Sequence, residues 1–411
     1  MKILFLCPSL VGAGVERRVC TLFNELLRLD IDVHLALLRY QGEFLSEVPK
    51  NRLRFIPPDA RRHRLLSRML PSRDLVQGLI GISQIRQLLA KCQPDLVFSF
   101  TLETTIPMVF NRFAACGKPF TWIISEDSNT AVAVRTCAPP IMNGMLRCLL
   151  AWVYRQADHV NCVSDAVAKS LCSGYGIHPE RVSILSNPVD LERISTAILS
   201  PTPINIPTNF VLAVGRLVKV KQFELLIRAF AKVRKTCPIQ LLILGEGPER
   251  VQLVREISDL GLEQDVLLPG FIDNPWIFMA RAKMLVLSSK LEGFGNVIVE
   301  AMAAGCPVVA TRCGGPEDII EDDRNGILVD QNEDAIAQAI QSLLTDSEKA
   351  RRLAHHALAD ASNYKADRIA AKLLSILNRL GCEQGLLNPI HSQGFPLDKA
   401  ASGYSKRPDN N

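Results

Sequence analysis

Short apolar runs alternate with amphipathic helical patterns along almost the whole chain, and this alternation limits the fold more than any other feature. The runs at 2–7 and 210–214, for example, are each followed by a helical pattern of more than ten residues. Such alternation is typical of a parallel sheet with helices on both faces. The sequence therefore predicts α/β structure, and 411 residues are enough for two domains with cores of their own.

The expected elements form two sets on either side of residue 200. Strands are predicted near 2–7, 32–38, 53–56, 95–99, 121–125, 159–163 and 183–185, and then near 210–214, 239–244, 266–268, 284–287, 307–310 and 326–329. Helices are predicted near 15–28, 78–91, 141–157, 164–173, 220–236, 247–260, 296–304 and 332–346. Two doubly wound Rossmann-like domains of this kind face a cleft at the carboxyl ends of both sheets.

A proline-rich connector separates the two sets. Residues 200–207 read SPTPINIP, and three prolines in seven residues make a stiff, non-helical link. The polar end of the chain, rich in Gly, Pro, Ser and Asn, favours a flexible tail. We expect an N-terminal domain over 1–198, a linker over 199–208, a C-terminal domain over 209–365, a last helix over 366–382 and the tail over 383–411.

Composition excludes several classes of protein. Apolar residues make up 48% of the chain and charged residues 22%, which fits a globular protein and not a disordered one. No apolar run reaches the ~18 residues of a membrane span, and the run before Pro8 is too short for a signal peptide. The twelve cysteines are scattered without a C-x-x-C pair, which indicates reduced thiols. We therefore expect a cytoplasmic protein.

Residues 288–327 place a glycine-rich turn and the start of a helix between two carboxylates, Glu292 and Glu300. Free N–H groups and the positive dipole end at a helix start suit an anionic phosphate. Carboxylates on either side can accept hydrogen bonds from sugar hydroxyls. Phosphate flanked by two polyols is a sugar nucleotide, which predicts a donor site. Its expected binding residues are Gly293, Phe294, Gly295, Asn296 and Glu300, with Glu292 beside the reacting sugar.

This segment resembles the donor site of retaining glycosyltransferases with the two-domain GT-B fold, specifically family 4. The resemblance rests on E-x7-E within EGFGNVIVEAMAAGCPVVAT, followed by GGPEDII and NGILV, and it covers roughly residues 1 to 375. It implies a hexosyltransferase (EC 2.4) that needs no metal and no cofactor. The donor would be a nucleoside-diphosphate sugar, with UDP favoured over GDP. In the family, Glu300 binds the ribose and Glu292 contacts the donor sugar near its reacting carbon.

Two cations follow the first strand of the second half. Gly215, Arg216 and Lys221 resemble the family's G-R-L-x-x-x-K-G, with Gln222 in place of the last glycine. Cations just past a strand end can bind a diphosphate through charge-assisted hydrogen bonds. They can also offset the charge that develops on the leaving group. We therefore expect Arg216 and Lys221 to be catalytic and Gly215 to lie at the donor.

Two further motifs are less specific. Gly245 opens a glycine-rich turn after the next strand, where a nucleotide contact and a plain tight turn both remain open. The D-x-D pattern at 30–32 lies far in sequence from the donor motifs, and we interpret it as structural. No metal ligand is predicted.

The loop after the first strand resembles the family's G-G-x-E-R segment beside the donor phosphates and the acceptor. A dinucleotide-binding fingerprint would need a third glycine where Arg17 stands, which argues against an oxidoreductase. Gly14 is expected at the donor. Glu16 either faces the acceptor or braces the first helix.

Ser125-Glu126-Asp127-Ser128 ends another predicted strand. Many family members have a histidine in place of Asp127, close to the transferred sugar. An aspartate can accept a hydrogen bond from a sugar hydroxyl but cannot supply a cation. We include Asp127 as catalytic and Glu126 on the acceptor side, and we interpret Asn187 as structural.

Positive charge is concentrated in the first half of the chain. Residues 1–200 carry a net charge of +6 and the remainder −1, and residues 50–73 hold eight Lys or Arg against one acid. Leucines and one methionine interleave with these cations, a pattern that suits an anionic membrane surface. We expect Arg61, Arg62, Arg64 and Arg68 to bind the inner face of the cytoplasmic membrane. A solvated basic loop is the alternative, and the lack of aromatic residues here argues against nucleic acid.

Lipid-linked saccharides lie at membranes, so the expected acceptor is a lipid-linked saccharide or a lipopolysaccharide or polysaccharide precursor. Two rival functions remain. One is a soluble storage-type glycosyltransferase, against which the basic segment argues. The other is a non-catalytic GT-B scaffold that binds nucleotide sugar, against which the intact Arg216, Lys221, Glu292 and Glu300 argue.

Overall fold

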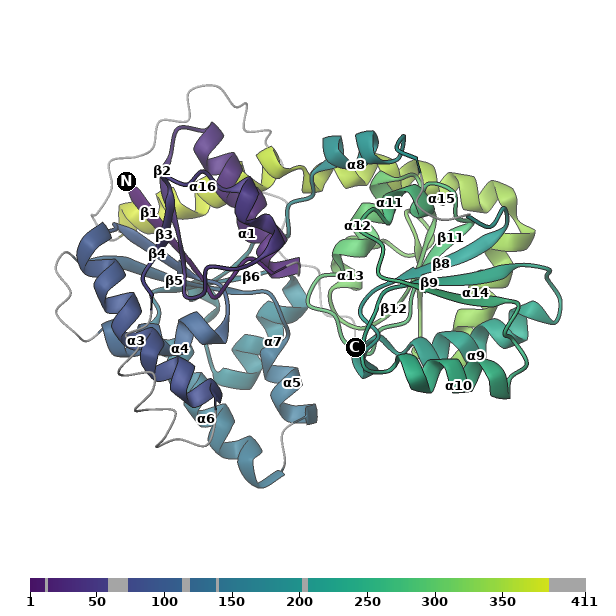
Figure 1. Ribbon diagram of the computed structural model, residues 1–411, viewed down its shortest axis with the longest axis horizontal. Coiled ribbons are helices and arrows are strands. Elements are labelled where there is room, and N and C mark those ends of the chain that lie inside the picture. Colours follow the sequence, from purple (N-terminus) through teal and green to yellow (C-terminus); the bar gives the residue numbers. More distant parts are fainter. Residues whose placement is uncertain (12–13, 58–72, 113–118, 138–139, 202–205, 384–411) are drawn as a thin grey trace, which may run out of the picture.

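Two α/β domains lie side by side in the computed structural model (Figure 1). It describes residues 1–11, 14–57, 73–112, 119–137, 140–201 and 206–383. Each domain is built on a sheet in which every strand pair is parallel, as the alternation of strands and helices predicts. Among these residues, no helix combines the length and the apolar character needed to cross a membrane.

The N-terminal sheet has seven strands in the order β3-β2-β1-β4-β5-β6-β7. Its strands are β1 (Lys2–Cys7), β2 (Asp32–Leu37), β3 (Leu53–Phe55), β4 (Leu96–Ser99), β5 (Thr121–Glu126), β6 (His159–Cys162) and β7 (Val182–Ile184). Its helices are α1 (Gly14–Arg28), α3 (Arg73–Cys92), α4 (Leu102–Arg112), α5 (Thr130–Cys137), α6 (Pro140–Gln156), α7 (Asp165–Tyr175) and α8 (Leu191–Ala197). All seven predicted strands are confirmed, whereas α4, α5 and α8 were not predicted.

The C-terminal sheet has six strands in the order β10-β9-β8-β11-β12-β13. Its strands are β8 (Phe210–Val214), β9 (Gln240–Leu244), β10 (Val266–Gly270), β11 (Met284–Leu287), β12 (Val308–Thr311) and β13 (Ile327–Val329). Its helices are α9 (Phe223–Arg234), α10 (Arg250–Asp259), α11 (Trp276–Met279), α12 (Asn296–Ala303), α13 (Pro316–Ile319), α14 (Glu333–Thr345) and α15 (Ser347–Ala361). The six predicted strands of this half are also confirmed.

Alternate residues of each central strand enter different cores, because side chains alternate across a sheet. In β1, Leu4 and Leu6 pack with α3 and α6, whereas Ile3 and Phe5 pack with α1. In the second domain, α9, α10 and α14 cover one face of the sheet, and α11, α12 and α15 cover the other. Strands buried on both faces in this way explain the continuous apolar runs of the sequence.

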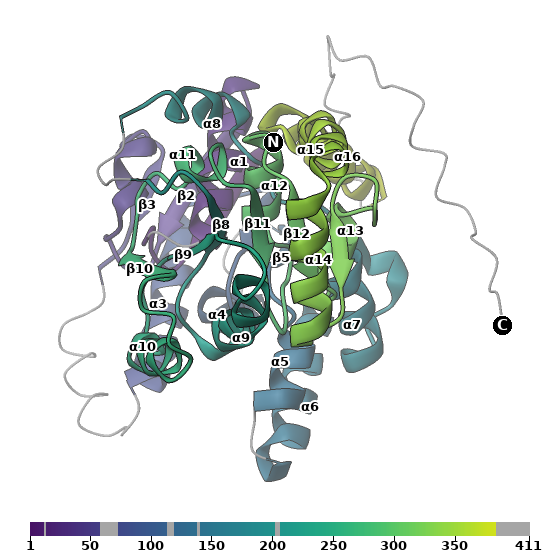
Figure 2. The same ribbon diagram turned by 90° about the vertical axis from the view of Figure 1, so that its right-hand side faces the viewer.

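The last helix returns to the first domain. Helix α16 (Ala366–Glu383) buries Leu373 and Leu377 in the same core as α1 and β1. Figures 1 and 2 show α15 and α16 running one after the other along one side of both domains. The chain therefore crosses between the domains at least twice, once near residues 199–208 and once before α16.

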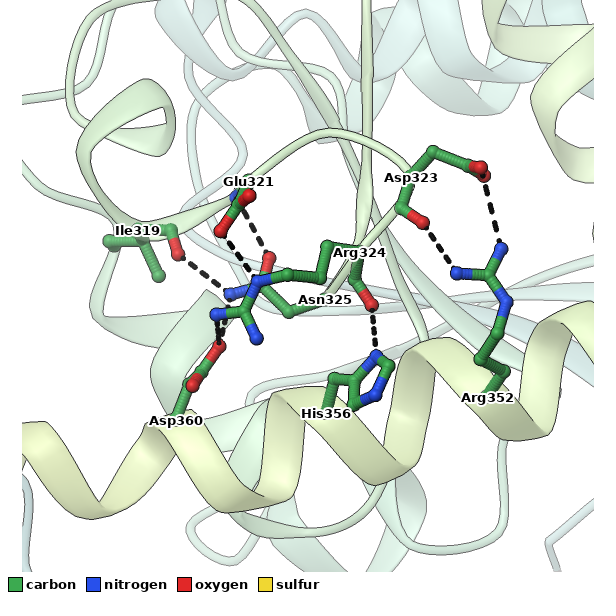
Figure 3. Close-up of polar contacts among 8 residues, drawn as sticks. All are labelled: Ile319, Glu321, Asp323, Arg324, Asn325, Arg352, His356 and Asp360. Carbon is green, nitrogen blue, oxygen red and sulfur yellow. Dashed lines mark hydrogen bonds and ion pairs between the residues drawn. The ribbon is translucent and has the colours of Figure 1, made fainter.

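A polar cluster fastens α15 to the turn that precedes β13 (Figure 3). The buried Asn325 donates to the carbonyl of Ile319 at 3.2 Å and to Asp360 Oδ2 at 2.8 Å, and its Oδ1 accepts from the backbone N–H of Glu321 at 2.9 Å. Arg324 ion-pairs with Asp360 in the same cluster. These contacts hold the helix that leads into α16.

Candidate functional site

The strand order marks where a ligand binds in each domain. Neighbours in the sheet are non-consecutive at β1 and β4 in the first domain and at β8 and β11 in the second. Open α/β sheets bind ligands at the carboxyl ends of strands beside such a switch in strand order. The loops that leave β1, β8 and β11 there carry Gly14, Arg216 and Glu292, respectively.

Lys221 and Glu292 lie together at this edge of the second domain. The Lys221 ammonium is 2.6 Å from Glu292 Oε1, and the Ser289 hydroxyl donates to the same oxygen at 2.6 Å. Both charged side chains are partly buried, with 22% and 13% of their area exposed. The predicted phosphate-binding cation and the predicted sugar-binding carboxylate are therefore direct partners, so the position of one depends on the other.

Arg216 is exposed, and its side chain makes no hydrogen bond or ion pair within the described part of the chain, so its guanidinium is available to an anion. Glu16, from the first domain, interacts with it electrostatically. Burial raises the pKa of the half-buried Glu16, and Arg216 acts in the opposite direction. Glu16 Oε2 is buried and has no hydrogen-bond partner among the described residues. Sequence reasoning left Glu16 open between the cleft and a bracing role, and this geometry favours the cleft.

Helix α12 begins where the two domains meet. Gly295, which precedes its first residue, has φ of 101°, a value that favours glycine. The side chain of Asn296 accepts a hydrogen bond from Asn187 of the first domain at 2.6 Å. A Cβ on Gly14 would lie 3.1 Å from Asn296 Nδ2. Asn187, which we interpreted as structural, therefore joins the two domains at the start of the helix.

Gly293 allows the closest approach between the domains. A Cβ at this position would lie 2.3 Å from the carbonyl oxygen of Asp127. Because real Cβ atoms do not come so near an oxygen, any other residue here would push the two loops apart. The turn predicted to bind the donor therefore packs directly on the segment predicted to face the transferred sugar.

Phe294 and Glu300 have different environments. The Phe294 ring is buried and packs edge-on against Tyr364 at 5.6 Å, so only its backbone can contact a donor. Burial raises the pKa of Glu300, while the Trp276 indole, Arg17 and Arg193 lower it. Glu300 thus has an aromatic ring and two cations of the first domain around it, a setting suited to a ribose.

Asp127 forms a buried ion pair that the sequence analysis missed. The Arg18 guanidinium, 1% exposed, pairs with Asp127 Oδ1 and donates to the carbonyl of Leu185 at 2.9 Å. Burial lowers the pKa of Arg18 to about 10, so it remains charged at neutral pH. Asp127 Oδ2 is buried, and no described residue is its hydrogen-bond partner. A signal existed: Arg18 lies four residues before Leu22, on the apolar face of the predicted helix.

Glu126 is buried inside the first domain. It is 5% exposed and accepts hydrogen bonds from Ser128, Thr130 and Tyr154, which engage both its oxygens. Burial raises the pKa of this carboxyl, and the hydroxyl donors lower it. The expectation of an acceptor-side role is corrected here, because the carboxylate ties the end of β5 to α6.

Gly215 and Gly245 pack against each other. A Cβ on Gly245 would lie 1.9 Å from the carbonyl oxygen of Gly215, and Gly245 has φ of 149°. The backbone N–H of Gly215 donates to the carbonyl of Leu244 at 3.0 Å. Gly245 is therefore required to bring the two loops together, which favours the tight-turn interpretation and holds Arg216 in place.

Some of the residues singled out from the sequence lie outside the part of the chain that the structure describes. Arg61, Arg62, Arg64 and Arg68 lie outside the described residues, as do Gly12 and Ala13 of the first loop. In the portion that is described, no group of three or more His, Cys, Asp and Glu side chains is placed to hold a metal ion.

Comparison with protein families assigns both halves of the chain. Residues 12–193 match the family described as Glycosyltransferase Family 4, and residues 196–359 match Glycosyl transferases group 1. The division between the two matches falls close to the proline-rich connector.

Curated relatives of this chain are named as glycosyltransferases. One, from Campylobacter jejuni, is 29% identical over 90% of this chain and 97% of its own length. It is an N-acetylgalactosamine-N,N'-diacetylbacillosaminyl-diphospho-undecaprenol 4-alpha-N-acetylgalactosaminyltransferase. Another, the lipopolysaccharide core biosynthesis glycosyltransferase LpsE of Rhizobium meliloti, is 33% identical over 49% of this chain and 58% of its own length.

A solved structure has the same fold. HepE from Anabaena, crystallised with UDP and glucose, superposes with a TM-score of 0.73 at 22% identity, over 92% of this chain and 100% of that chain. HepE thus has the same fold of two doubly wound domains as this chain.

Proposed function

The chain is a member of the group 1, family 4 glycosyltransferases with the GT-B fold, and on that premise we propose that it transfers a hexose-type sugar from a nucleoside diphosphate to a hydroxyl of a lipid-linked saccharide or a lipopolysaccharide or polysaccharide precursor. The observation that carries the proposal is the Lys221–Glu292 pair, 2.6 Å apart at the carboxyl edge of the donor domain, with Arg216 free beside it.

The proposed donor lies across the carboxyl ends of β8 and β11. Its diphosphate meets Arg216, Lys221 and the amino-terminal end of α12, where cations and free N–H groups favour an anion. Glu300 accepts hydrogen bonds from the ribose hydroxyls, and Trp276 lies beside it. UDP is favoured as the nucleotide, a preference supported by the UDP found in HepE.

The proposed reaction retains the configuration at the anomeric carbon. The acceptor oxygen attacks this carbon from the face that the diphosphate leaves, so one C–O bond forms as the other breaks. The acceptor proton passes to an oxygen of the departing phosphate. Arg216 and Lys221 stabilise the charge that develops there, where electrostatic stabilisation contributes most. Neither a metal ion nor a cofactor is part of this proposal.

Asp127 and Glu292 position the transferred sugar in this scheme. Asp127 Oδ2 is a buried carboxylate oxygen without a partner, and it can accept a hydrogen bond from a sugar hydroxyl. Glu292 keeps one oxygen on Lys221 and Ser289, and its other oxygen can bind a second hydroxyl.

The acceptor is proposed from the relatives and from charge. The Campylobacter relative acts on a diphospho-undecaprenol substrate, and LpsE acts in lipopolysaccharide core biosynthesis. The net charge of +6 in residues 1–200 suits an anionic membrane surface. We therefore propose a cytoplasmic protein, peripheral on the inner face of the membrane.

Two measurements test the chemistry. In isothermal titration, a UDP-sugar should bind wild type. Glu300→Ala should lose this binding, because the proposed ribose contact is gone. NMR of the product should show the anomeric configuration of the donor. An inverted product would contradict the retaining reaction, whereas equal donor binding by Glu300→Ala would contradict the assigned ribose site.

Membrane docking is tested by sedimentation with anionic vesicles. Wild type should sediment, and replacement of Arg61, Arg62, Arg64 and Arg68 by Gln should release it, since each cation near such a surface contributes about 1 kcal/mol. Unchanged sedimentation of the variant would refute the basic-segment hypothesis. If wild type itself fails to sediment with the vesicles, a soluble storage-type enzyme is favoured. A non-catalytic scaffold would be favoured if Lys221→Ala left cellular glycan unchanged.

A further inference from the structure

A second cationic site lies where β1, β2 and β3 of the N-terminal sheet meet the last turn of α3. A cavity of about 270 Å³ is formed there by Lys2, His34, Arg54, Phe55, Ile56, Leu88, Lys91 and Cys92, and we call it the basic cavity. Lys2 opens β1 and Lys91 lies in the last turn of α3, whereas the predicted donor residues follow the carboxyl ends of their strands. A ligand in the basic cavity would therefore be separate from the sugar nucleotide.

Three cations of the basic cavity have no carboxylate partner among the described residues. Lys2 Nζ donates to the carbonyl of Cys92 at 3.2 Å, and Arg54 donates to backbone carbonyls of Asn51 and Leu53. Lys91 is exposed and unpaired within that same part of the chain. Like charges gathered without a counter-ion repel one another, and an anion between them would relieve this repulsion.

The cations of the basic cavity affect the pKa values of its buried groups, His34 and Cys92. Burial lowers the pKa of His34, and Arg54, Arg52 and Lys2 lower it further, against the opposite effect of Asp32. Burial raises the pKa of the Cys92 thiol, and Arg54, Lys2 and Lys91 act to lower it. Cations of three different elements therefore converge on one point.

His34 supplies an unused polar atom. The side chain is 10% exposed, and its Nε2 lies 3.3 Å from Asp32 Oδ1. Its Nδ1 is buried and has no hydrogen-bond partner among the described residues. Buried polar atoms are normally hydrogen-bonded, and His34 is one of the residues that line the basic cavity.

We propose that the basic cavity binds the phosphate group of a phosphate ester. Phosphate brings two negative charges and several acceptor oxygens, which match three cations and an imidazole. The opposite wall is apolar, formed by Phe55, Ile56 and Leu88, and it accommodates the organic part of an ester. The phosphate comes either from a lipid headgroup or from a soluble ester, and both have the same recognising chemistry.

The charged and titratable groups around His34 come from every element packed against it. They are Lys2 of β1, Asp32 of β2, Arg52 and Arg54 at β3, Lys91 and Cys92 of α3, and Asp95 before β4, which accepts from the backbone N–H of Lys2. An anion added to this set stabilises the imidazolium form. Bound phosphate should therefore raise the pH at which His34 titrates.

The test follows the His34 ring by NMR in the full chain as pyrophosphate is added, with His34→Asn to assign the signal. We expect the signal to shift and the titration midpoint to rise. Arg54→Gln and Lys91→Gln should each weaken binding about tenfold, the loss of one charge-assisted hydrogen bond. The matched control is Lys235→Gln, an exposed lysine of the second domain that should bind as wild type does.

Vesicles identify the source of the phosphate. If sedimentation with phosphatidylglycerol vesicles falls in Arg54→Gln and Lys91→Gln, the ligand is a lipid headgroup. If sedimentation is unchanged while the NMR response is lost, it is a soluble ester. The proposal is overturned if neither pyrophosphate nor these vesicles bind wild type, or if both variants bind as wild type does. These readouts do not depend on sugar transfer, so they are separable from the proposed function.

Discussion

At the residue scale, the buried pair of Arg18 and Asp127 lies where we propose that the sugar is transferred. Asp127 stands where many family members have histidine, and Arg18 places a cation directly beside it. The pair engages Oδ1 and leaves Oδ2 without a hydrogen-bond partner among the described residues. In the proposed scheme Arg18 is thus a positioning residue, and Asp127 meets the sugar.

Breaking this pair should be costly to stability. Arg18→Met or Asp127→Asn alone leaves a buried charge without its partner and should lower the free energy of unfolding by about 3–5 kcal/mol. The double variant removes both charges and should regain most of this loss in urea denaturation. Its transfer activity should nevertheless stay low, because Asp127 Oδ2 is gone. Recovery of both stability and activity would show that the pair is merely structural.

Lys221 should be essential for turnover. Lys221→Ala removes the cation proposed to meet the leaving phosphate and should reduce kcat about 100- to 1,000-fold, as the loss of one transition-state contact does. Lys219→Ala is the matched control, since Lys219 lies in the same short turn, is exposed, and has no ion pair in the described part of the chain. Equal effects in the two variants, measured as nucleotide release, would exclude a specific role.

The charges of the donor site could be found from sequence, but their partners could not. Arg216, Lys221, Glu292 and Glu300 stand in recognisable motifs. The Arg18–Asp127 pair joins residues 109 positions apart, and no periodicity predicts such a contact. Glu126 was misplaced for a related reason, because its hydrogen-bond partner Tyr154 comes from α6, 28 residues away.

At the element scale, strands were predicted better than helices. Buried parallel strands leave continuous apolar runs, and all thirteen were located. Helix α4 carries Pro107 and two adjacent threonines, which lower helix propensity, and α5 (TAVAVRTC) alternates like a strand. Tertiary packing overrides local preference in both, since α4 packs on α3 and α5 on α7.

The cluster of Figure 3 should determine how firmly α15 is held. Asn325→Ala removes three hydrogen bonds of a side chain that is 3% exposed. It should lower the free energy of unfolding by about 1–3 kcal/mol for each group left unsatisfied. The matched control, Arg352→Ala, removes an exposed contact to Asp323 and should change the free energy of unfolding by under about 1 kcal/mol. Similar losses in chemical denaturation would refute a specific role for Asn325.

At the scale of the whole molecule, glycine controls how closely the domains meet. The start of α12 contacts the first domain through Asn187–Asn296, and Gly293 packs on the Asp127 carbonyl. Asp318 of α13 also accepts from the backbone N–H of Asp165. The proposed donor and acceptor residues come from different domains, so we expect transfer to depend on this close approach.

Gly293→Ala should open the molecule. The added Cβ would clash with the Asp127 carbonyl, which should enlarge the radius of gyration measured by small-angle scattering and reduce turnover about 100-fold through misplacement of the reacting groups. Gly144→Ala is the control, because a Cβ there meets nothing within 4 Å. Normal turnover in Gly293→Ala would mean that the contact is not needed for catalysis.

The central claim is transfer from a nucleotide sugar by the Arg216–Lys221–Glu292 site. The most direct measurement is the release of nucleoside diphosphate by purified protein from UDP-, GDP- and ADP-sugars, with and without a membrane lipid extract. We predict release from one donor, stimulated by lipid, lost in Lys221→Ala and kept in Lys219→Ala. A folded wild-type protein that neither binds nor turns over any of these donors would contradict the account.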